Sequence, residues 1–231
     1  MSRLSECARP APSRHSFASR GAAGAGRLSR LVPALLLISL VAASCLALLA
    51  VSGAAQEDRK QTRPTKARLA VAVEKVLVLD GDTVLIDWGN GDQETVRILG
   101  IDTPETQNIE HNLPYDQPFG REAASFARGA FAVASQVEIL RAEQKDPYGR
   151  TLGYIFLNGK NYSELVVRAH LAEESVTHFG DNGFPDEAKA VTEAARSAGP
   201  VPFEPPHEYR TRMRKVTESL RAAGALPPAK Q

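Results

Sequence analysis

Three short runs rich in valine, leucine and isoleucine follow one another in the middle of the chain, and only tight turns separate them. The runs are Leu69–Leu79, Thr83–Trp88 and Glu94–Ile101. Runs of this length with partial alternation of apolar and polar residues are typical of strands. Between the second and third runs, Gly89–Asp92 offers the glycine and asparagine that a hairpin turn requires. This part of the chain is therefore predicted to form an antiparallel meander.

The elements predicted after the meander extend this pattern. A polar, proline-containing loop from Thr103 to Pro118 comes first, and helical spacing and strand-like runs then alternate. The resulting order is three strands, a helix, two strands and two helices, which predicts an α+β fold built on a five-stranded OB-type Greek-key β-barrel with three helices. The later elements are expected at Phe119–Ala134 (helix), Gln136–Arg141 and Thr151–Leu157 (strands), and Tyr162–Leu171 and Pro185–Ser197 (helices).

The predicted domain, residues 69–200, is acidic, although the whole chain is almost neutral. It holds 21 Asp and Glu against 11 Lys and Arg. Non-specific affinity for nucleic acid comes from Lys and Arg that displace counterions from phosphates. A nucleic-acid function would therefore have to rest on a local site and not on a broad basic face.

The N-terminal part of the chain is predicted to be a membrane or export signal. A basic region, residues 1–30, precedes Leu31–Val51, which is 21 residues long and carries no charge. About 20 apolar residues span a bilayer as a helix, and the preceding arginines favour an N-terminus inside the cytoplasm. The segment is either a single-pass anchor or a signal cleaved near Ser52–Ala55. Both alternatives place the rest of the chain outside the cytoplasm, after a polar linker at residues 52–68.

The C-terminal tail, residues 201–231, is rich in proline and carries six basic against three acidic residues. Within it, Glu208–Ala223 has the pattern of a basic amphipathic helix. We expect this helix to be solvated and to pack on the barrel. Alternatively, the protein is a membrane-tethered scaffold that uses this basic tail.

Three short motifs contain residues suited to chemistry: DGDT at Asp80–Thr83, RILGIDTPET at Arg97–Thr106 and DPYGR at Asp146–Arg150. The turn before the second strand and the end of the third strand meet at one edge of an antiparallel meander. Asp82 and Asp102 can therefore converge. Each motif alone could be an ordinary turn, and only their common position makes them one candidate site.

The residue types in these motifs favour calcium and phosphate chemistry. Two carboxylates and a backbone carbonyl form the oxygen-rich site that Ca²⁺ prefers, and the absence of His and Cys argues against zinc. A bound cation can hold a phosphate oxygen and a water molecule together. Glu105 could then deprotonate or orient that water. Arg97 and Arg150 could bind the phosphate more strongly as charge develops on it.

These motifs, in this order, make the chain resemble the staphylococcal nuclease family over residues 69–200. This resemblance implies that Asp82, Asp102 and the carbonyl of Thr103 bind calcium, and that Arg97, Glu105 and Arg150 are catalytic. It also implies hydrolysis of DNA and RNA with release of 3′-phosphate ends. The motifs that carry the resemblance are Asp80–Val84, Arg97–Thr106, Phe119–Gly129, Lys145–Phe156 and Asn161–Ala172.

Some stretches depart from the family pattern. Where the family often has aromatic residues that stack on a base, this chain has SVTHFG at Ser175–Gly180, so His178 or Phe179 would bind substrate together with Tyr148. The loop Gln107–Pro118 is also altered. We expect a monomer without an obligate protein partner. A non-catalytic OB module that binds nucleic acid or protein is the alternative to a nuclease.

Overall fold

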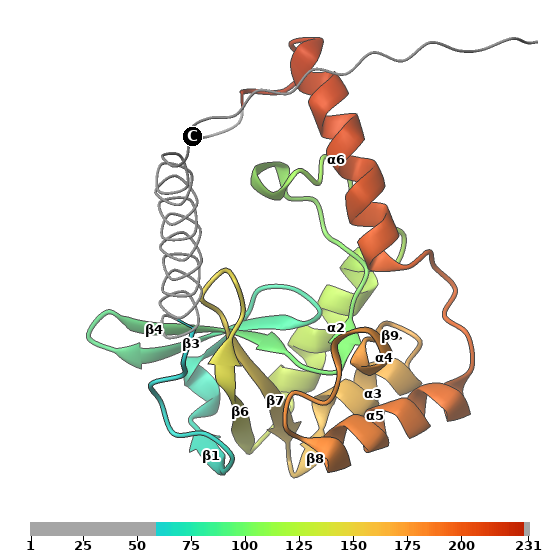
Figure 1. Ribbon diagram of the computed structural model, residues 1–231. Helices are drawn as coiled ribbons and strands as arrows, with labels where there is room; N and C mark the ends of the chain where they lie inside the picture. Colours follow the sequence, from blue (N-terminus) through green and yellow to red (C-terminus); the bar gives the residue numbers. More distant parts are fainter. Residues whose placement is uncertain (1–58, 229–231) are drawn as a thin grey trace, which may run out of the picture. The chain divides into compact units, whose positions relative to one another are not determined.

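A computed structural model describes residues 59–228 of the chain (Figure 1). In these residues a mixed sheet of seven strands lies against a group of helices. The order of the main strands is β1-β6-β7-β4-β3-β2, and β8 pairs with β7. The strands of this sheet are β1 (Arg68–Val71), β2 (Val76–Val78), β3 (Thr83–Gly89), β4 (Asp92–Ile98), β6 (Val137–Lys145), β7 (Thr151–Leu157) and β8 (Lys160–Asn161).

The sheet curls into a half-barrel because two consecutive strands lie at opposite ends of the strand order. β1 pairs with β6 at one edge, and β2 pairs with β3 at the other. Only the short 3₁₀ helix η1 (Val73–Lys75) and its flanking residue separate them. The single strand predicted at Leu69–Leu79 is therefore two strands, because the chain must turn a corner to reach the second edge.

The β3–β4 hairpin agrees with the prediction. Asn90 and Gly91 adopt positive φ in the turn, and Thr83 lies opposite Arg97 in the register. The third predicted strand is interrupted after Ile98. Gly100 has a φ of 81°, and the chain continues as the short strand β5 (Ile101–Asp102), which pairs with β9 (Glu173–Glu174) in a separate two-stranded sheet.

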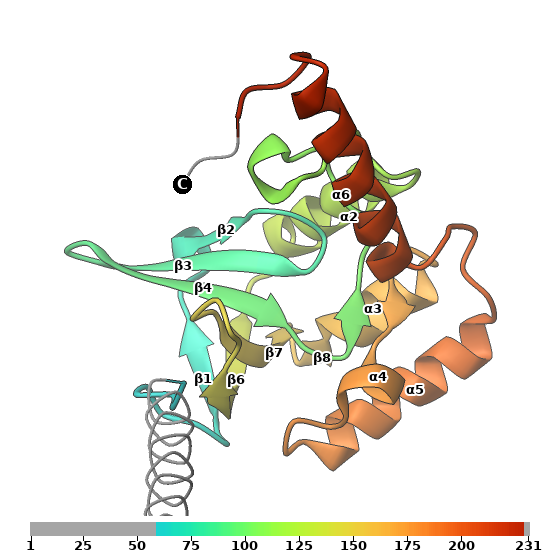
Figure 2. The ribbon, with the colours of Figure 1, turned by 45° about the horizontal axis from the view of Figure 1, so that its top comes forward.

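The helices cover one side of the half-barrel (Figure 2). The predicted helices are present at nearly the expected bounds as α2 (Gly120–Ala132), α3 (Tyr162–Arg168) and α5 (Pro185–Ala198). A further one-turn helix, α4 (Val176–Phe179), follows β9. The α+β class is thus confirmed. The main core gathers buried residues of the strands and of these helices, including Ile86, Val96, Ile139, Tyr162 and Val191.

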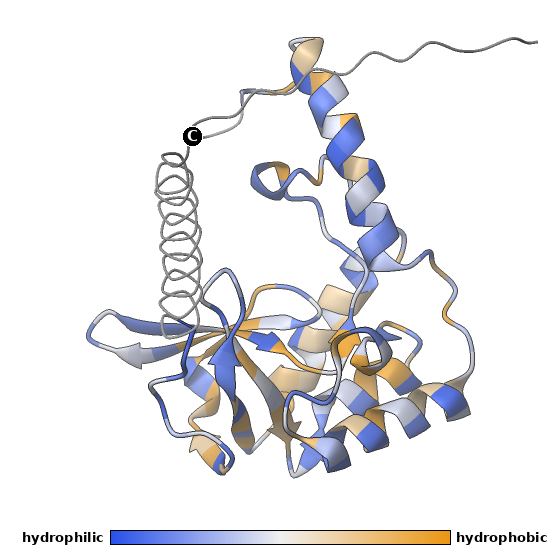
Figure 3. Ribbon diagram, in the orientation of Figure 1, coloured by the Kyte–Doolittle hydropathy of each residue, from blue (hydrophilic) through white to orange (hydrophobic). Residues whose placement is uncertain are grey.

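The C-terminal helix α6 (Pro206–Ala222) is present as predicted, but it packs on different residues from those expected. It lies beside the loop Gln107–Pro118, which contains the 3₁₀ helix η2 (Ile109–His111) (Figures 1 and 2). Leu113 of the loop forms a small core with Tyr209 and Met213 of α6, separate from the main core. Most of α6 is coloured hydrophilic in Figure 3. The C-terminal helix and the altered loop Gln107–Pro118 therefore pack on each other.

The segment before β1 lies against the end of β6, where a free linker was expected. The backbone amide of Gln61 donates to the carbonyl of Glu143 at 2.8 Å, and the amide of Lys66 donates to the carbonyl of Arg141 at 3.1 Å. The side chain of Gln61 is buried and donates to Thr151 Oγ1. These contacts attach residues 59–67 to the sheet.

The predicted anchor Leu31–Val51 lies outside the described residues, as does the possible cleavage region near Ser52–Ala55. Within residues 59–228, none of the helices has the length and apolar character needed to cross a bilayer. The membrane segment therefore remains a prediction from sequence.

Candidate active site

Asp82 and Arg97 form the centre of the candidate site. Asp82 is buried at the start of β3, and the register of the β3–β4 hairpin places Arg97 beside it. The guanidinium of Arg97 pairs with Asp82 through Nη1 and with Asp102 through Nη2, the second at 2.7 Å. The sequence prediction that Asp82 and Asp102 converge is thus reproduced, because one guanidinium contacts both carboxylates.

Buried groups of α3, together with Thr103 just after β5, hold the turn that carries Asp82 and the adjacent break between β4 and β5. The hydroxyl of Tyr162 donates to the carbonyl of Gly81 at 2.7 Å, and Ser163 Oγ donates to the carbonyl of Leu99. Thr103 donates through its backbone amide and its Oγ1 to Asp82 Oδ2, at 2.9 and 3.0 Å. A Cβ at Gly81 would lie 2.7 Å from Thr103 Oγ1, so this close approach requires glycine. The side chain of Thr103 therefore orients Asp82.

Glu105 lies just beyond Asp102 and is held through its backbone. The side chain of Gln117, which is 2% exposed, accepts a hydrogen bond from the amide of Glu105 at 3.1 Å. The amide of Gln117 in turn donates to the carbonyl of Glu105. Burial raises the pKa of the Glu105 carboxyl, and the charges of Asp102 and Asp80 raise it further, while Arg210 opposes both. A partly buried carboxylate with a raised pKa is a reasonable general base.

Gly120 at the start of α2 allows the backbone of Glu105 to pass close by. A Cβ at position 120 would lie 2.8 Å from the carbonyl carbon of Glu105 and would also clash with its oxygen. We expect Gly120→Ala to lower the free energy of unfolding by about 1–3 kcal/mol, because backbone must move to make room. Chemical denaturation of the purified chain measures this change.

Gly129 provides the matched control for that substitution. It lies in the same helix, and a Cβ there would meet nothing within 4 Å. Alanine has the higher helix propensity, so Gly129→Ala should leave stability unchanged or raise it by about 0.5–1 kcal/mol. If both substitutions changed the free energy of unfolding by the same amount, the close approach of Gly120 to the Glu105 backbone would not be the cause of the loss.

Arg150 does not contact the other predicted catalytic residues in this structure. Its Nε donates to Asp146 Oδ2 at 2.6 Å, and its amide donates to Asp146 Oδ1. Its guanidinium lies 5.6 Å from the centre of the Tyr148 ring, and that ring is 84% exposed. The charge of Arg150 nevertheless acts on the carboxyl of Asp80. Asp146, which sequence reasoning placed in the motif DPYGR without giving it a role, thus orients Arg150.

Asp80 is an additional carboxylate at the site. It accepts a hydrogen bond from the amide of Asp82 at 3.0 Å. Burial raises the pKa of Asp80, and the charges of Arg97 and Arg150 oppose this change. Sequence reasoning treated this residue as part of a tight turn. Nothing in the local pattern showed that its carboxylate would lie within the influence of both arginine charges.

Arg210 of α6 is the third residue to which sequence reasoning assigned no role in the site. Its Nη1 donates to Asp102 Oδ1 at 3.1 Å and to Glu105 Oε1 at 2.5 Å, and its Nη2 donates to Asp102 Oδ2 at 2.8 Å. Burial alone would raise the pKa of Asp102, but hydrogen bonds from Arg210 and the charges of Arg97 and Arg210 bring it below its ordinary value. The C-terminal tail therefore contributes directly to the site.

The predicted substrate-binding residues His178 and Phe179 lie in α4, at the end of the connection from β9. Phe179 is 72% exposed, so its ring is accessible for stacking. The ring of His178 lies 5.7 Å from the ring of His207 at the start of α6. No contact of either residue shows substrate binding, and their role remains a prediction.

The carboxylates fit a calcium site in chemistry and proximity. Asp82 and Asp102 offer hard oxygen donors, and both contact the guanidinium of Arg97, so they lie close enough to share one cation. In residues 59–228, however, no group of three or more His, Cys, Asp or Glu side chains is arranged to hold a metal ion. Two carboxylates and the Thr103 carbonyl would require water molecules to complete the coordination of calcium.

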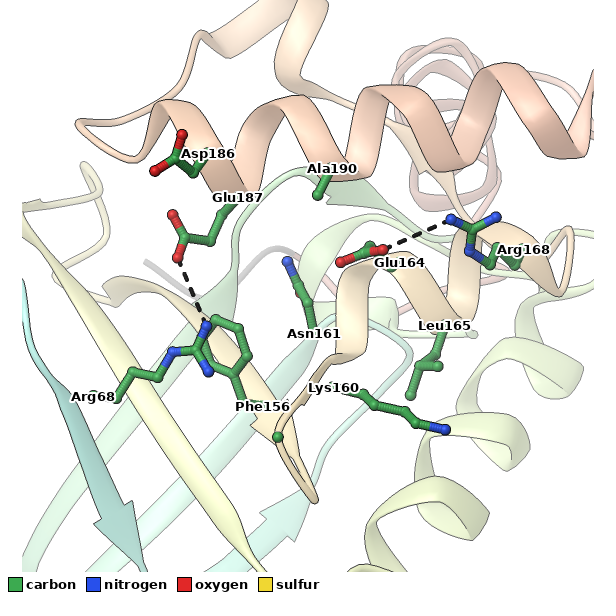
Figure 4. A pocket seen from close by; sticks show the side chains of 11 residues that line it. Arg68, Phe156, Lys160, Asn161, Glu164, Leu165, Arg168, Asp186, Glu187 and Ala190 are labelled. Carbon is green, nitrogen blue, oxygen red and sulfur yellow. Dashed lines mark ion pairs between the residues drawn. The ribbon is translucent and has the colours of Figure 1, made fainter.

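A separate hollow of about 420 Å³ is bordered by β1, β7, α3 and α5 (Figure 4). The guanidinium carbon of Arg68 lies 3.4 Å from the centre of the Phe156 ring, and Arg68 pairs with Glu187. Asn161 Nδ2 is buried there without a hydrogen-bond partner among the described residues. None of the predicted catalytic residues lines this hollow. It is therefore distinct from the candidate active site.

Comparisons with known proteins cover most of the chain that carries these residues. The family model described as "Staphylococcal nuclease homologue" matches residues 95–199, which include Arg97, Asp102, Glu105 and Arg150 but not Asp82. The thermonuclease of Staphylococcus hyicus is 36% identical over 97 residues, which are 42% of this chain and 55% of that protein.

Two proteins of Bacillus subtilis (strain 168) are similar over a longer stretch. The SPbeta prophage-derived endonuclease YokF is 33% identical over 122 residues, which are 52% of this chain and 39% of that protein. Endonuclease YncB is 31% identical over 122 residues, which are 52% of this chain and 55% of that protein. The chain thus spans about half the length of the curated relatives it matches, or less.

Proposed function

Because residues 95–199 belong to the staphylococcal nuclease homologue family, we propose that this protein is a calcium-dependent nuclease that hydrolyses phosphodiester bonds in DNA, RNA or both. The observation that carries the proposal is the convergence of Asp82, Asp102 and Glu105 around Arg97 and Arg210. The OB-type barrel expected from sequence would be the scaffold, and Asp82, Asp102 and the Thr103 carbonyl would hold the ion.

The roles of the side chains follow from their positions. A bound calcium ion would offset phosphate charge and hold a phosphate oxygen and a water molecule on one template. Glu105 accepts the proton of the attacking water, or orients that water for in-line attack. Arg97, which pairs with Asp82 and Asp102 in this structure, donates to a phosphate oxygen. Arg150, with Nε bound to Asp146, binds the phosphate from the edge.

The acidic composition of the domain means that substrate phosphate must be bound by a local group of positive charges. With 21 acidic against 11 basic residues in positions 69–200, non-specific attraction of polyanions is weak. Substrate phosphate would be held chiefly by the cation, Arg97 and Arg150. Tyr148, His178 and Phe179 would contact the bases. We also propose that the domain lies outside the cytoplasm, anchored by Leu31–Val51 or released after cleavage.

The test is hydrolysis of labelled single-stranded DNA and RNA by the purified chain, with calcium and with an excess of chelator. We expect cleavage in calcium and a rate at least about tenfold lower after chelation, because a bound cation stabilises the transition state by several kcal/mol. Absence of cleavage in calcium, by a folded protein, would favour the non-catalytic binding module. Cleavage at the same rate in chelator would exclude the role of the ion.

A further inference from the structure

Arg210 takes up the oxygen atoms that a cation at Asp102 would use. Oδ1 of Asp102 accepts from both Arg97 and Arg210, and Oδ2 accepts from Arg210. The same guanidinium also binds Glu105 Oε1. In this arrangement the metal ligand and the base of the proposed nuclease are both occupied by one side chain of α6.

The position of Arg210 is set by a specific fit between α6 and the loop Gln107–Pro118. Thr217 Oγ1 donates to the carbonyl of Asn112 at 3.0 Å, and the hydroxyl of Tyr209 donates to the carbonyl of Tyr115 at 3.0 Å. Near the far end of the helix, Arg221 Nη1 donates to Asn112 Oδ1 at 2.6 Å. These bonds and the small apolar core place Arg210 on the carboxylates.

The loop Gln107–Pro118 contacts the backbone of Glu105 directly. The side chain of Gln117 accepts from the amide of Glu105 and donates to the carbonyl of Glu204 in the segment just before α6. The core of Leu113, Tyr209 and Met213 is separate from the main core and much smaller. Movement of α6 with its loop would therefore disturb few of the contacts that hold the barrel together.

We propose that Arg210 is a further residue of the active site, which binds Asp102 in alternation with the divalent cation and thereby sets the calcium concentration that the site requires. The inference rests on the proposed function. A guanidinium and a calcium ion repel each other at contact distance. While Arg210 is bound, both oxygens of Asp102 accept its hydrogen bonds, so an ion would have to bind Asp102 directly beside the guanidinium. Calcium binding thus releases Arg210, and the release frees Glu105 to accept a proton.

Calorimetric titration of calcium into the full chain in detergent, without substrate, tests this alternation. The proteins compared are the parent, Arg210→Gln and Arg214→Gln. Arg214 is exposed at the next turn of α6, so its replacement removes the same charge from the same helix. We expect Arg210→Gln to bind calcium about tenfold more tightly than the parent, in the usual range of coupling between two sites. Arg214→Gln should stay close to the parent.

Equal calcium affinities of the two variants, or weaker binding by Arg210→Gln, would overturn the inference and leave the proposed function in place if calcium-dependent hydrolysis persists. If none of the three proteins binds calcium and none hydrolyses nucleic acid, the proposed function fails, and this inference fails with it. The two failures are therefore distinguishable.

Hydrogen exchange gives a second test. It uses the parent protein alone, so it does not depend on whether a variant folds. Coupling is reciprocal, so an ion that displaces Arg210 must weaken the attachment of α6. Backbone amides of residues 206–222 should exchange faster with calcium than with chelator. Unchanged exchange over this segment, at a calcium concentration that saturates the protein, would also overturn the inference.

Discussion

A Glu105→Gln variant should hydrolyse nucleic acid about 10²–10⁴-fold more slowly than the parent at saturating calcium, the usual contribution of a general base. Glutamine has nearly the same shape as glutamate, but it cannot accept the proton of the attacking water. The fall should appear in kcat, with KM little changed, because phosphate is bound by other residues. Initial rates on a labelled oligonucleotide over a range of concentrations measure both constants.

Glu122→Gln is the matched control for that measurement. Glu122 is exposed in the first turn of α2, close in sequence to the site but not part of it. Its replacement should leave the rate unchanged. If the Glu105→Gln protein is folded and cuts as fast as the parent, Glu105 is not the base. A large rise in KM with unchanged kcat would assign Glu105 to substrate binding instead.

A Glu94→Gln variant should lose about 3–5 kcal/mol of unfolding free energy at pH 7. Both oxygens of Glu94 accept from the buried guanidinium of Arg141 at 2.8 Å, and Thr151 and Trp88 donate to the same carboxylate. Glutamine removes the negative charge and leaves Arg141, which is 1% exposed, without its counter-charge. Breaking one partner of a buried ion pair typically costs this amount. Denaturant midpoints of the two proteins measure the difference.

The pH dependence of this loss follows from the ionisation of Glu94. Burial raises its pKa, but the hydrogen bonds of Arg141 and Thr151 outweigh burial, so the folded-state pKa lies below the ordinary value of 4.5. The stabilisation is therefore fully present above about pH 4.5 and is lost as the pH falls through the lower folded-state pKa. The difference between parent and variant should shrink on acidification below pH 4.5.

Glu138→Gln on β6 is the control for Glu94→Gln. Glu138 lies on β6, the strand that also carries Arg141, and is only partly buried. A surface substitution of this kind should change stability by less than about 0.5 kcal/mol. If both variants lost a similar free energy of unfolding, the buried ion pair of Glu94 with Arg141 would not be the source of the stabilisation.

The part of the site that lies on the β3–β4 hairpin could be predicted because its geometry is local. Strand alternation and a two-residue turn are readable in the sequence, and they place Arg97 beside Asp82. Asp102 follows the same strand after a short break. These residues are separated by at most about twenty positions in the sequence. Over that range, strand alternation and hairpin register are sufficient to predict which residues meet.

Arg210 could not be predicted in this way, because 108 positions separate it from Asp102 and no strand register connects them. The basic amphipathic pattern of the tail and the altered loop were both visible in the sequence. Their packing on each other depends on the tertiary fit of Leu113 with Tyr209 and Met213. The excess of acid in the domain and of base in the tail was the one sequence signal that pointed toward such a contact.

The corner between β1 and β2 was also missed for a physical reason. Residues 69–79 read as one apolar run, and hydropathy does not distinguish a straight strand from one that bends through a 3₁₀ turn. The bend becomes necessary only when the partners are known, since β6 and β3 lie far apart in the strand order.

The pairing of β1 with β6 also bears on how the protein avoids self-association. β1 is short, begins with Arg68 and covers Ile139 and Leu140 of a nine-residue strand. Without residues 59–71, β6 would present a long row of unpaired backbone groups beside apolar side chains. Such open edges recruit strands from other molecules and promote aggregation. The short strand β1 thus protects the edge of β6 from pairing with other molecules.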